Sequence, residues 1–540
     1  MHPDMQDIDV CGSDTWICTD GGVKYSPDFF ATPGTDCNTG IYASDFHGFG
    51  QGWNEDIMAG GRWHNGDIVA AAAYSEGNTL HVGGVEYATG HVLLSNPRKV
   101  YFSDAGTSVV PDRLDGKVTT TYGEQFAGKK PHETLMTSNE LSFDPRYALR
   151  LMMSSNEQDD RDKVYVSEDE GRSFRLFCDL EGEDVADYEF ARSNPDYVYV
   201  AGKYNIYYSY DNGASWDWFE NRPFDDESNG SVGIDIAVDP RDEHKIWYTN
   251  GTLPGRVAYT MDKGETWHYP LTDRLKSLRF NWIILTGNEK NGVYLGTQEQ
   301  ARVFYKDDTM ADWIEYSDGL PSGARMARLK PFYKEGLLRA ATSQGIWEAP
   351  LRDRLFRPVA QPMALNIGNG DISATPGMEV VFDSYSIVNQ NGAKWQWSFS
   401  PQPQRVTGAD TRSPRVVFGN KGSYDVTLTV TTPQGTDSRT IRGMIRIDVE
   451  TGLPEPVAMP DVSVEAEAAA GRLVLTVDAK GLDETKTLTL HNAKGMLLHK
   501  EVIGRGIQKK TLSLPNYAKG IYIYELRTPN RKYFGKFAIE

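Results

Sequence analysis

Polar residues near the start of the chain have the types that could bind a metal ion or a sugar. Two or three imidazoles with nearby carboxylates can ligate a metal, and carboxylates beside a guanidinium can line a sugar cleft. The candidate set is His2, Asp4, Asp7, His47, Arg62, His64 and Asp67. The simpler interpretation, which we favour, is that these side chains hold turns and the rim of a channel. We assign no catalytic residue and expect no cofactor, while a structural metal ion stays an open question.

Three repeated segments indicate which elements must position such side chains. Each reads [S/T]-x-D-x-G-x-[S/T]-[F/W], and their starts lie 42 and 51 residues apart, about the length of a four-stranded propeller blade. The Asp can accept hydrogen bonds from turn amides, the Gly permits positive φ, and the aromatic ring can pack between sheets. The residues at the four main positions of the pattern are Ser167, Asp169, Gly171 and Phe174, then Ser209, Asp211, Gly213 and Trp216, then Thr260, Asp262, Gly264 and Trp267.

These segments resemble the Asp-box, or BNR repeat, of sialidases, xyloglucanase-like glycosidases and sortilin-like receptors. The resemblance implies a β-propeller whose Asp-box aspartates are structural and lie outside, away from the central channel. Weaker copies at 19–28, 100–108 and 303–307 extend the repeat. We therefore predict an all-β chain that begins with a propeller of about seven blades over residues 1–352.

Residues 363–448 form a second predicted module. A W-x-W-x-F run starts at Trp395, and a G-x-Y-x-V-T-L-x-V run starts at Gly422. In the second run, apolar residues alternate with threonines, as in a half-buried sandwich strand. The order of strands resembles a PKD domain, which is an immunoglobulin-like spacer or adhesion module. Trp395 and Trp397 are expected to pack in its core.

Residues 460–540 form a third predicted module. An N-A-K-G turn at 492–495, a K-G-I-Y strand entry at 519–522 and a final K-F-x-I strand at 536–539 resemble the C-terminal sorting domain of type IX secretion substrates. The resemblance implies that the type IX machinery is a partner, and that the protein is secreted across the outer membrane to the cell surface or the exterior.

Composition limits the remaining partners. The net charge of −19 and the pI of about 5.1 disfavour nucleic acid, and no apolar run is long enough for a transmembrane segment. The sequence leaves open whether two of Cys11, Cys18 and Cys37 form a disulfide or all three are free thiols. Because residues 1–7 lack the features of a signal peptide, we expect that a region preceding Met1 is missing.

The leading hypothesis is a non-enzymatic propeller that is displayed at the surface and binds a glycan or a protein. The alternative is a glycoside hydrolase of the Asp-box class, either xyloglucanase-like or sialidase-like. The R-I-P arginine motif of sialidases is absent from the sequence, and no segment matches the carboxylate motifs of xyloglucanases. We therefore lean against an enzyme.

Overall fold

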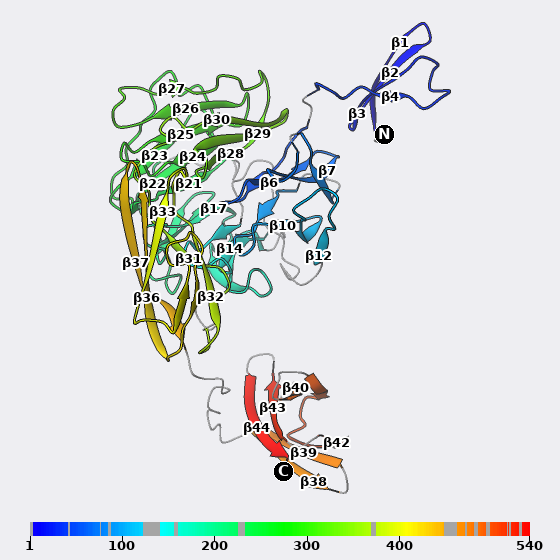
Figure 1. Cartoon of the computed structure of the whole chain (residues 1–540), viewed down its shortest axis with the longest axis vertical. Helices are drawn as coiled ribbons and strands as arrows, with labels where there is room; N and C mark the ends of the chain where they lie inside the picture. The colour runs from blue at the N-terminus through cyan, green and yellow to red at the C-terminus, as the bar shows by residue number, and fades with distance from the viewer. Residues whose placement is uncertain are drawn as a thin grey trace. The chain divides into compact units, whose positions relative to one another are not determined.

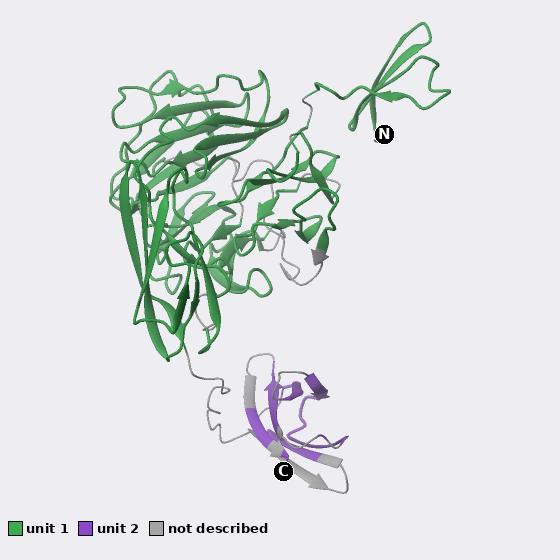
Figure 2. Ribbon diagram, viewed as in Figure 1, with its two compact units in different colours: residues 1–447 green, residues 448–540 purple. Residues whose placement is uncertain are grey.

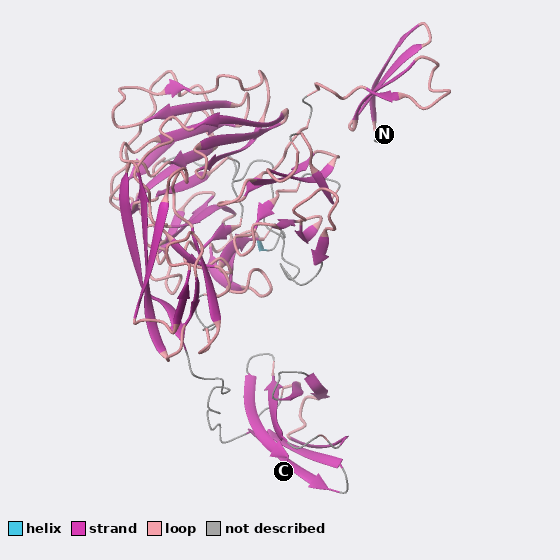
Figure 3. Cartoon of the chain, viewed as in Figure 1, coloured by secondary structure: helices cyan, strands magenta, loops and turns pink. Residues whose placement is uncertain are grey.

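In the computed structural model, every regular element of the described residues that is given a residue range below is a β-strand (Figures 1 and 3). It divides into two compact units, residues 1–447 and 448–540 (Figure 2). This confirms the predicted all-β class. No helix among the described residues is long and apolar enough to cross a bilayer. The structure describes residues 4–41, 44–75, 77–84, 88–121, 141–155, 160–224, 233–368, 374–447, 462–469, 472–479, 484–492, 497–515, 517, 520–528 and 532–539.

Seven antiparallel sheets of consecutive strands follow one another between residues 50 and 350 in the described part of the chain. Blade 1 contains β5 (Gly50–Gln51), β6 (Ile57–Arg62), β7 (Gly66–Ala71) and β8 (Leu80–Gly83). Blade 2 contains β9 (His91–Val92), β10 (Lys99–Phe102), β11 (Gly106–Val109) and β12 (Thr119–Thr121). Blade 3 contains β13 (Ser142–Phe143), β14 (Leu151–Ser154), β15 (Lys163–Ser167) and β16 (Arg175–Asp179). Blade 4 contains β17 (Val185–Phe190), β18 (Val198–Gly202), β19 (Ile206–Ser209) and β20 (Asp217–Trp218).

The last three blades complete the series. Blade 5 contains β21 (Asp235–Asp239), β22 (Asp242–Thr249) and β23 (Val257–Thr260). Blade 6 contains β24 (Trp282–Leu285), β25 (Val293–Thr297), β26 (Arg302–Lys306) and β27 (Ile314–Glu315). Blade 7 contains β28 (Met326–Phe332), β29 (Leu337–Thr342) and β30 (Gly345–Pro350). Seven blades among the described residues are consistent with the predicted number.

Apolar side chains from facing blades form a cluster at each junction, and the last blade packs against the first. The successive junctions contain Val69 with Val100, Tyr101 with Leu151, Met152 with Val200, Tyr199 with Ile236, Trp247 with Phe304, Tyr294 with Leu338, and Ala341 with Ile68. At the last junction, the Phe46 amide donates to Thr342 O at 3.1 Å. Arg339 there pairs with Asp56 at 2.7 Å. The blades therefore close into a ring, the arrangement of a β-propeller.

A further sheet precedes the ring and has the strand order of a blade. It contains β1 (Met5–Cys11), β2 (Asp14–Thr19), β3 (Gly22–Ser26) and β4 (Thr35–Asp36). Every described side chain of β1 is exposed, whereas the first strands of blades 4 and 5 are almost entirely buried. The sheet is therefore a blade-like unit additional to the seven that form the ring.

The three Asp-box segments share one set of hydrogen bonds. In the second, the Ser209 hydroxyl donates to Asp211 at 2.8 Å and accepts from the Gly213 amide at 2.8 Å. The other Asp211 oxygen accepts from the Ser215 hydroxyl at 2.6 Å. In the third segment, a Cβ at Gly264 would lie 2.8 Å from the Phe219 ring of the preceding blade. Each turn is thus self-contained, and all three glycines have a positive φ, which favours Gly. Close packing against the preceding blade adds a second reason at Gly213 and Gly264.

The sheet that precedes the ring contains a fourth turn of this kind. The Ser26 hydroxyl donates to Asp28 at 2.7 Å and accepts from the Phe30 amide at 2.8 Å. The Thr32 hydroxyl donates to Asp28 at 2.7 Å. Phe30 occupies the position of the repeat's Gly and has a positive φ of 60°. The hydrogen bonds of the repeat therefore persist here without its glycine.

The PKD region is a two-sheet sandwich. One sheet contains β31 (Pro362–Ala364), β32 (Glu379–Ser384), β35 (Arg415–Val417) and β34 (Arg405–Thr407). The other contains β33 (Lys394–Ser400), β36 (Gly422–Thr432) and β37 (Gly435–Ile447). Trp397 is buried between the sheets, and Trp395 packs against the same core. Neither Trp is therefore a free platform for a sugar.

The PKD sandwich is docked onto the ring by buried contacts. The Arg439 guanidinium donates to Ser193 O at 2.8 Å and to Gln361 Oε1 at 2.6 Å. The Tyr147 hydroxyl of blade 3 donates to Met444 O at 2.7 Å. Tyr147 and Ser193 belong to the loops between the first and second strands of blades 3 and 4, so the sandwich covers the ring at these loops.

The second compact unit is a separate sandwich. One sheet contains β38 (Val462–Ala469), β39 (Arg472–Ala479) and β42 (Lys509–Pro515). The other contains β41 (Leu497–Ile503), β40 (Lys486–Asn492), β43 (Gly520–Arg527) and β44 (Lys532–Ile539). Leu475, Leu488 and Leu526 are fully buried between them. The four cysteines of the chain all carry free thiols.

Candidate functional site: the central channel

The first strand of each blade lines the centre of the ring, where a cavity of about 370 Å³ lies. These strands are buried because each is covered by its own blade and by the next. Polar side chains project from them at repeated positions. Asp187 and Glu189 come from β17, Asp235 from β21 and Arg328 from β28. The sheet order of the blades therefore brings together carboxylates that are about 48 residues apart.

Each of these carboxylates is fixed by the backbone of the next blade. Asp187 accepts a hydrogen bond from the Ile236 amide at 2.8 Å. Asp235 accepts one from the Ile283 amide at 2.6 Å. The innermost strand of a blade has one edge without a neighbouring strand, so its amides need other acceptors. The aspartates supply them and join adjacent blades.

Burial changes the protonation of the channel carboxyls. Burial raises the pKa of Glu189 to about 8, against the hydrogen bond from the Val238 amide. Burial and the neighbouring Asp187 charge raise the pKa of Asp235, while Arg328 opposes the rise. With a pKa of about 8, Glu189 holds a proton at neutral pH and can donate as well as accept hydrogen bonds.

The PKD sandwich closes one end of the channel. Its Tyr385 lines the cavity, and its carbonyl accepts from Arg192 of blade 4 at 2.6 Å. The Arg192 guanidinium lies 4.2 Å from the Tyr385 ring centroid and 4.8 Å from that of Trp53. Trp53 donates to Ser386 O at 3.2 Å. These groups form the wall of the cavity on the PKD side.

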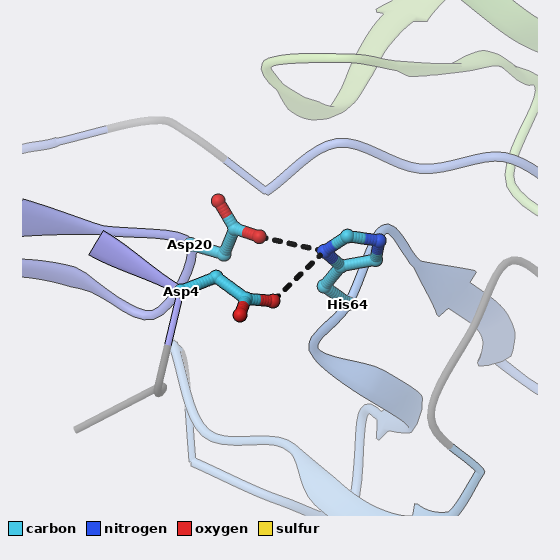
Figure 4. Close-up of side chains that lie close together, drawn as sticks. All are labelled: Asp4, Asp20 and His64. Atoms are coloured by element: carbon cyan, nitrogen blue, oxygen red, sulfur yellow. Dashed lines mark hydrogen bonds and ion pairs between the residues drawn. The ribbon is translucent and has the colours of Figure 1, made fainter. Parts of the chain in front are cut away.

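The residues predicted from the start of the chain are only partly brought together. His64, in the turn between β6 and β7, faces Asp20 and Asp4 (Figure 4). Its Nδ1 lies 2.6 Å from Asp20 Oδ2 and 3.8 Å from Asp4 Oδ2. Among the described residues, these three form the one group of three or more His, Cys, Asp or Glu residues whose ligand atoms lie within 4.8 Å of one another. The set ties the preceding sheet to blade 1 by an ion pair when His64 is protonated.

The other predicted residues have separate environments. His47 contacts Arg325 and stacks on Trp63, with ring centroids 4.8 Å apart. Burial lowers the pKa of Arg62, and the buried Asp67 charge opposes this shift. Asp7 lies on the exposed strand β1, and its carboxylate accepts from the Ile8 amide. His2 lies outside the described residues. A common metal or sugar site of the whole set stays a prediction.

The channel residues were missed because each looks ordinary in its own strand. The signal for them was the repeat itself. Asp187 and Asp235 lie near the starts of successive first strands and are 48 residues apart, a spacing between the 42 and 51 residues that separate the Asp-box turns. Aligning the blades by their turns would have placed both aspartates in the first strands, which line the ring centre.

Family comparisons match three separate parts of the chain. The description "Sortilin, neurotensin receptor 3" matches residues 118–321, "PKD domain" matches 359–447, and "Secretion system C-terminal sorting domain" matches 470–540. These matches confirm the predicted presence of a sortilin-like propeller, a PKD domain and a sorting domain. No curated protein matches the sequence significantly.

Several solved structures resemble the chain at low identity. An ancestral GH74 enzyme has 13% identity over 92% of this chain, with a TM-score of 0.42, and this chain spans 62% of its length. YCF48 bound to a D1 peptide has 12% identity over 54% of this chain and 89% of its own, with a TM-score of 0.32. YCF48 from Cyanidioschyzon merolae has 10% identity over 64% and 95%, with a TM-score of 0.30.

Proposed function

We propose that this exported propeller protein is a non-enzymatic surface receptor whose central channel binds the end or loop tip of a protein ligand. The sorting-domain match indicates type IX secretion to the cell surface or the exterior. The family description that matches the propeller names a receptor, which agrees with a binding role. We also propose boundaries of 1–352, 363–448 and 460–540 for the three domains.

The observation that carries this proposal is the channel cavity, which the PKD sandwich lines on one side. A cavity of about 370 Å³ is of a size that holds a small ligand. Since Tyr385 and its neighbours line the cavity on the PKD side, we expect a ligand to enter and leave by the opposite end. A peptide end or a loop tip fits such a cavity better than a long glycan, which would need two open ends. The carboxyls, Arg328 and the aromatic rings offer it hydrogen bonds and stacking.

A channel-filling substitution tests the proposal. Ile284 on β24 is half-buried and lines the cavity. The Trp side chain of Ile284→Trp should therefore fill the cavity without disturbing the outer strands of the blades. Peptides would be selected from a random library on the full-length protein, and their affinities measured by biolayer interferometry. We expect Ile284→Trp to weaken the selected peptides at least about tenfold. The matched control, Trp218→Ala on an exposed outer strand, should leave them unchanged.

The opposite result would refute channel binding. If the selected peptides bind wild type and Ile284→Trp equally, the channel is not the binding site. A glycan array is probed in parallel. If only glycans bind wild type, and Ile284→Trp no longer binds them, the ligand of the channel is a glycan rather than a protein. In either case the folded state of each variant is checked by thermal unfolding.

The alternative function is a glycoside hydrolase, and one observation favours it. Glu189 has a raised pKa and lies near the channel aspartates, as a general acid beside a second carboxylate would. Against this, Asp187 and Asp235 are each bound to a backbone amide of the next blade. Release of reducing sugar from plant or host glycans, abolished by Glu189→Gln, would establish the hydrolase and exclude the receptor.

A further inference from the structure

The outer edge of blade 7 differs from that of the other blades. Its described strands are ordered β28-β29-β30, whereas blades 1, 2, 3, 4 and 6 each have a fourth strand. Blade 5 has a rudiment of one, because His268 forms a bridge with Tyr259 beyond β23. Within the part of the chain that the structure describes, β30 is thus the outermost strand of its blade, and no other strand pairs with its outer side. Contacts from other segments reach its two ends, where the Gly345 amide donates to Ser44 O and the Tyr316 hydroxyl donates to Pro350 O.

The hydrogen-bond register shows which groups of β30 are available. The Leu351 amide donates to Gly336 O at 2.8 Å, and β30 continues this pairing with β29 in register. In an antiparallel pair, bonded and non-bonded positions alternate. Ile346 and Glu348 therefore direct their amides and carbonyls away from β29. An edge of this kind is a template for another strand.

The junction between blades 6 and 7 lacks a side chain that other junctions have. Trp216, Trp267 and Trp313 each stand at the start of a fourth strand and pack toward the preceding blade. Their ring centroids lie 5.3 Å from Phe177, 6.2 Å from Phe219 and 6.4 Å from Trp247, respectively. Among the described residues, blade 7 has no fourth strand and so provides no ring of this kind to blade 6.

A cavity of about 230 Å³ lies between blades 6 and 7. Val303 of blade 6, and Leu338 and Trp347 of blade 7, contribute apolar walls. These walls belong to the inner faces of β26, β29 and β30, between which the missing ring would insert. Asp318 and Glu348 lie at its margin. The outer edge of β30 and the apolar cavity are therefore adjacent parts of one blade that has three described strands instead of four.

We propose that β30 and this cavity bind an extended segment of a partner protein, which adds a fourth strand to blade 7. The backbone of the segment pairs with Ile346 and Glu348, and a Trp or other large apolar side chain enters the cavity. The acidic margin and the net charge of −19 favour basic residues beside that side chain. This site is separate from the central channel, and its occupant is a strand rather than a chain end.

A labelled peptide provides the first test. The probe is the fluorescein-labelled heptapeptide Lys-Ser-Trp-Lys-Val-Lys-Thr, and its anisotropy is followed during titration with full-length protein. We expect saturable binding that weakens at least about tenfold when the peptide Trp is replaced by Ala. The Ala peptide has the same charge as the Trp peptide. Equal binding of the two peptides would mean that only charge attracts the peptide, and would overturn the proposal.

Two substitutions in the protein locate the site. Glu348→Pro removes an outward amide, while the matched control Glu348→Gln removes the charge but keeps the amide. Ala349→Leu reduces the cavity from a position on its wall. We expect Glu348→Pro and Ala349→Leu each to weaken the peptide at least about tenfold, and Glu348→Gln to retain most of the affinity. Thermal unfolding verifies that each variant is folded.

Other outcomes would overturn the assignment. Unchanged affinity in both folded variants would exclude β30 as the binding edge. A concentration-dependent dimer that Glu348→Pro abolishes would identify the occupant as a second copy of the chain instead. Ile284→Trp, which fills the channel, should leave this peptide's affinity unchanged. The failure of one site is therefore distinguishable from the failure of the other.

Discussion

Trp313 is the side chain that fills the junction between blades 5 and 6, and its removal tests how blades are held together. It is only 2% exposed, packs against Trp247, and donates its indole N–H to Pro270 O at 2.9 Å. Trp313→Ala would leave at this junction the kind of cavity that the junction between blades 6 and 7 already has. Truncation of a buried Trp costs about 3–5 kcal/mol, since both apolar contact and packing are lost.

The assay is urea-induced unfolding of the full chain, followed by tryptophan fluorescence and by circular dichroism. The matched control is Trp218→Ala, because Trp218 lies on the fourth strand of blade 4 but is 53% exposed. The control should change the free energy of unfolding by no more than about 0.5 kcal/mol. Equal effects of the two substitutions would refute the view that the ring at the start of each fourth strand secures the junction.

Four further predictions follow from the described contacts. Because burial raises the pKa of Glu189 to about 8 from 4.5, the folded protein keeps a proton that the unfolded chain has lost, so stability should fall as pH rises from about 5 to 8. Glu189→Gln should remove that fall in thermal unfolding curves. Hydrogen bonds from Thr266 and Thr260 lower the pKa of Asp262 to about 2, so its contribution is present above pH 3.8 and is lost as pH falls through about 2. Asp262→Asn should accordingly lower the melting temperature at pH 7, and the difference from wild type should disappear below pH 2. Arg439→Leu leaves buried carbonyls without a donor, at a cost of about 1–3 kcal/mol, and should increase protease cleavage between the ring and the PKD sandwich, as seen by mass spectrometry of the fragments. Deletion of residues 470–540 should retain the protein in the periplasm, as measured by cell fractionation, whereas appearance at the surface would contradict the role of the sorting domain.

The features that could be predicted from sequence are those whose partners are close in the chain. The Asp-box turn was predictable because Ser209, Asp211 and Ser215 bond to one another within a stretch of seven residues. The PKD core was predictable because Val426, Leu428 and Val430 alternate with threonines along one strand. In both cases the physical requirement is satisfied locally, so the residue order carries it.

The channel required partners that the sequence does not place side by side. Asp187 is explained only by the Ile236 amide, which is 49 residues away in the next blade. The Asp20–His64 pair joins two sheets, and Asp20 reads as a turn residue until the ring is assembled. The turn at Ser26 was recognised only weakly because Phe30 replaces the repeat's Gly. Closure of a ring, rather than any single motif, decides these contacts.

The junction between blades 7 and 1 has a consequence for how the ring can be rearranged. Each blade is built from consecutive strands, and at this junction the described contacts are side-chain packing and a few hydrogen bonds rather than a strand shared between the two ends. The ring therefore has no element that must begin it. A circular permutant that is opened at another interblade loop, with residues 44 and 350 joined by a linker, would keep every blade contiguous. The junction that now separates first from last would become an ordinary internal connection.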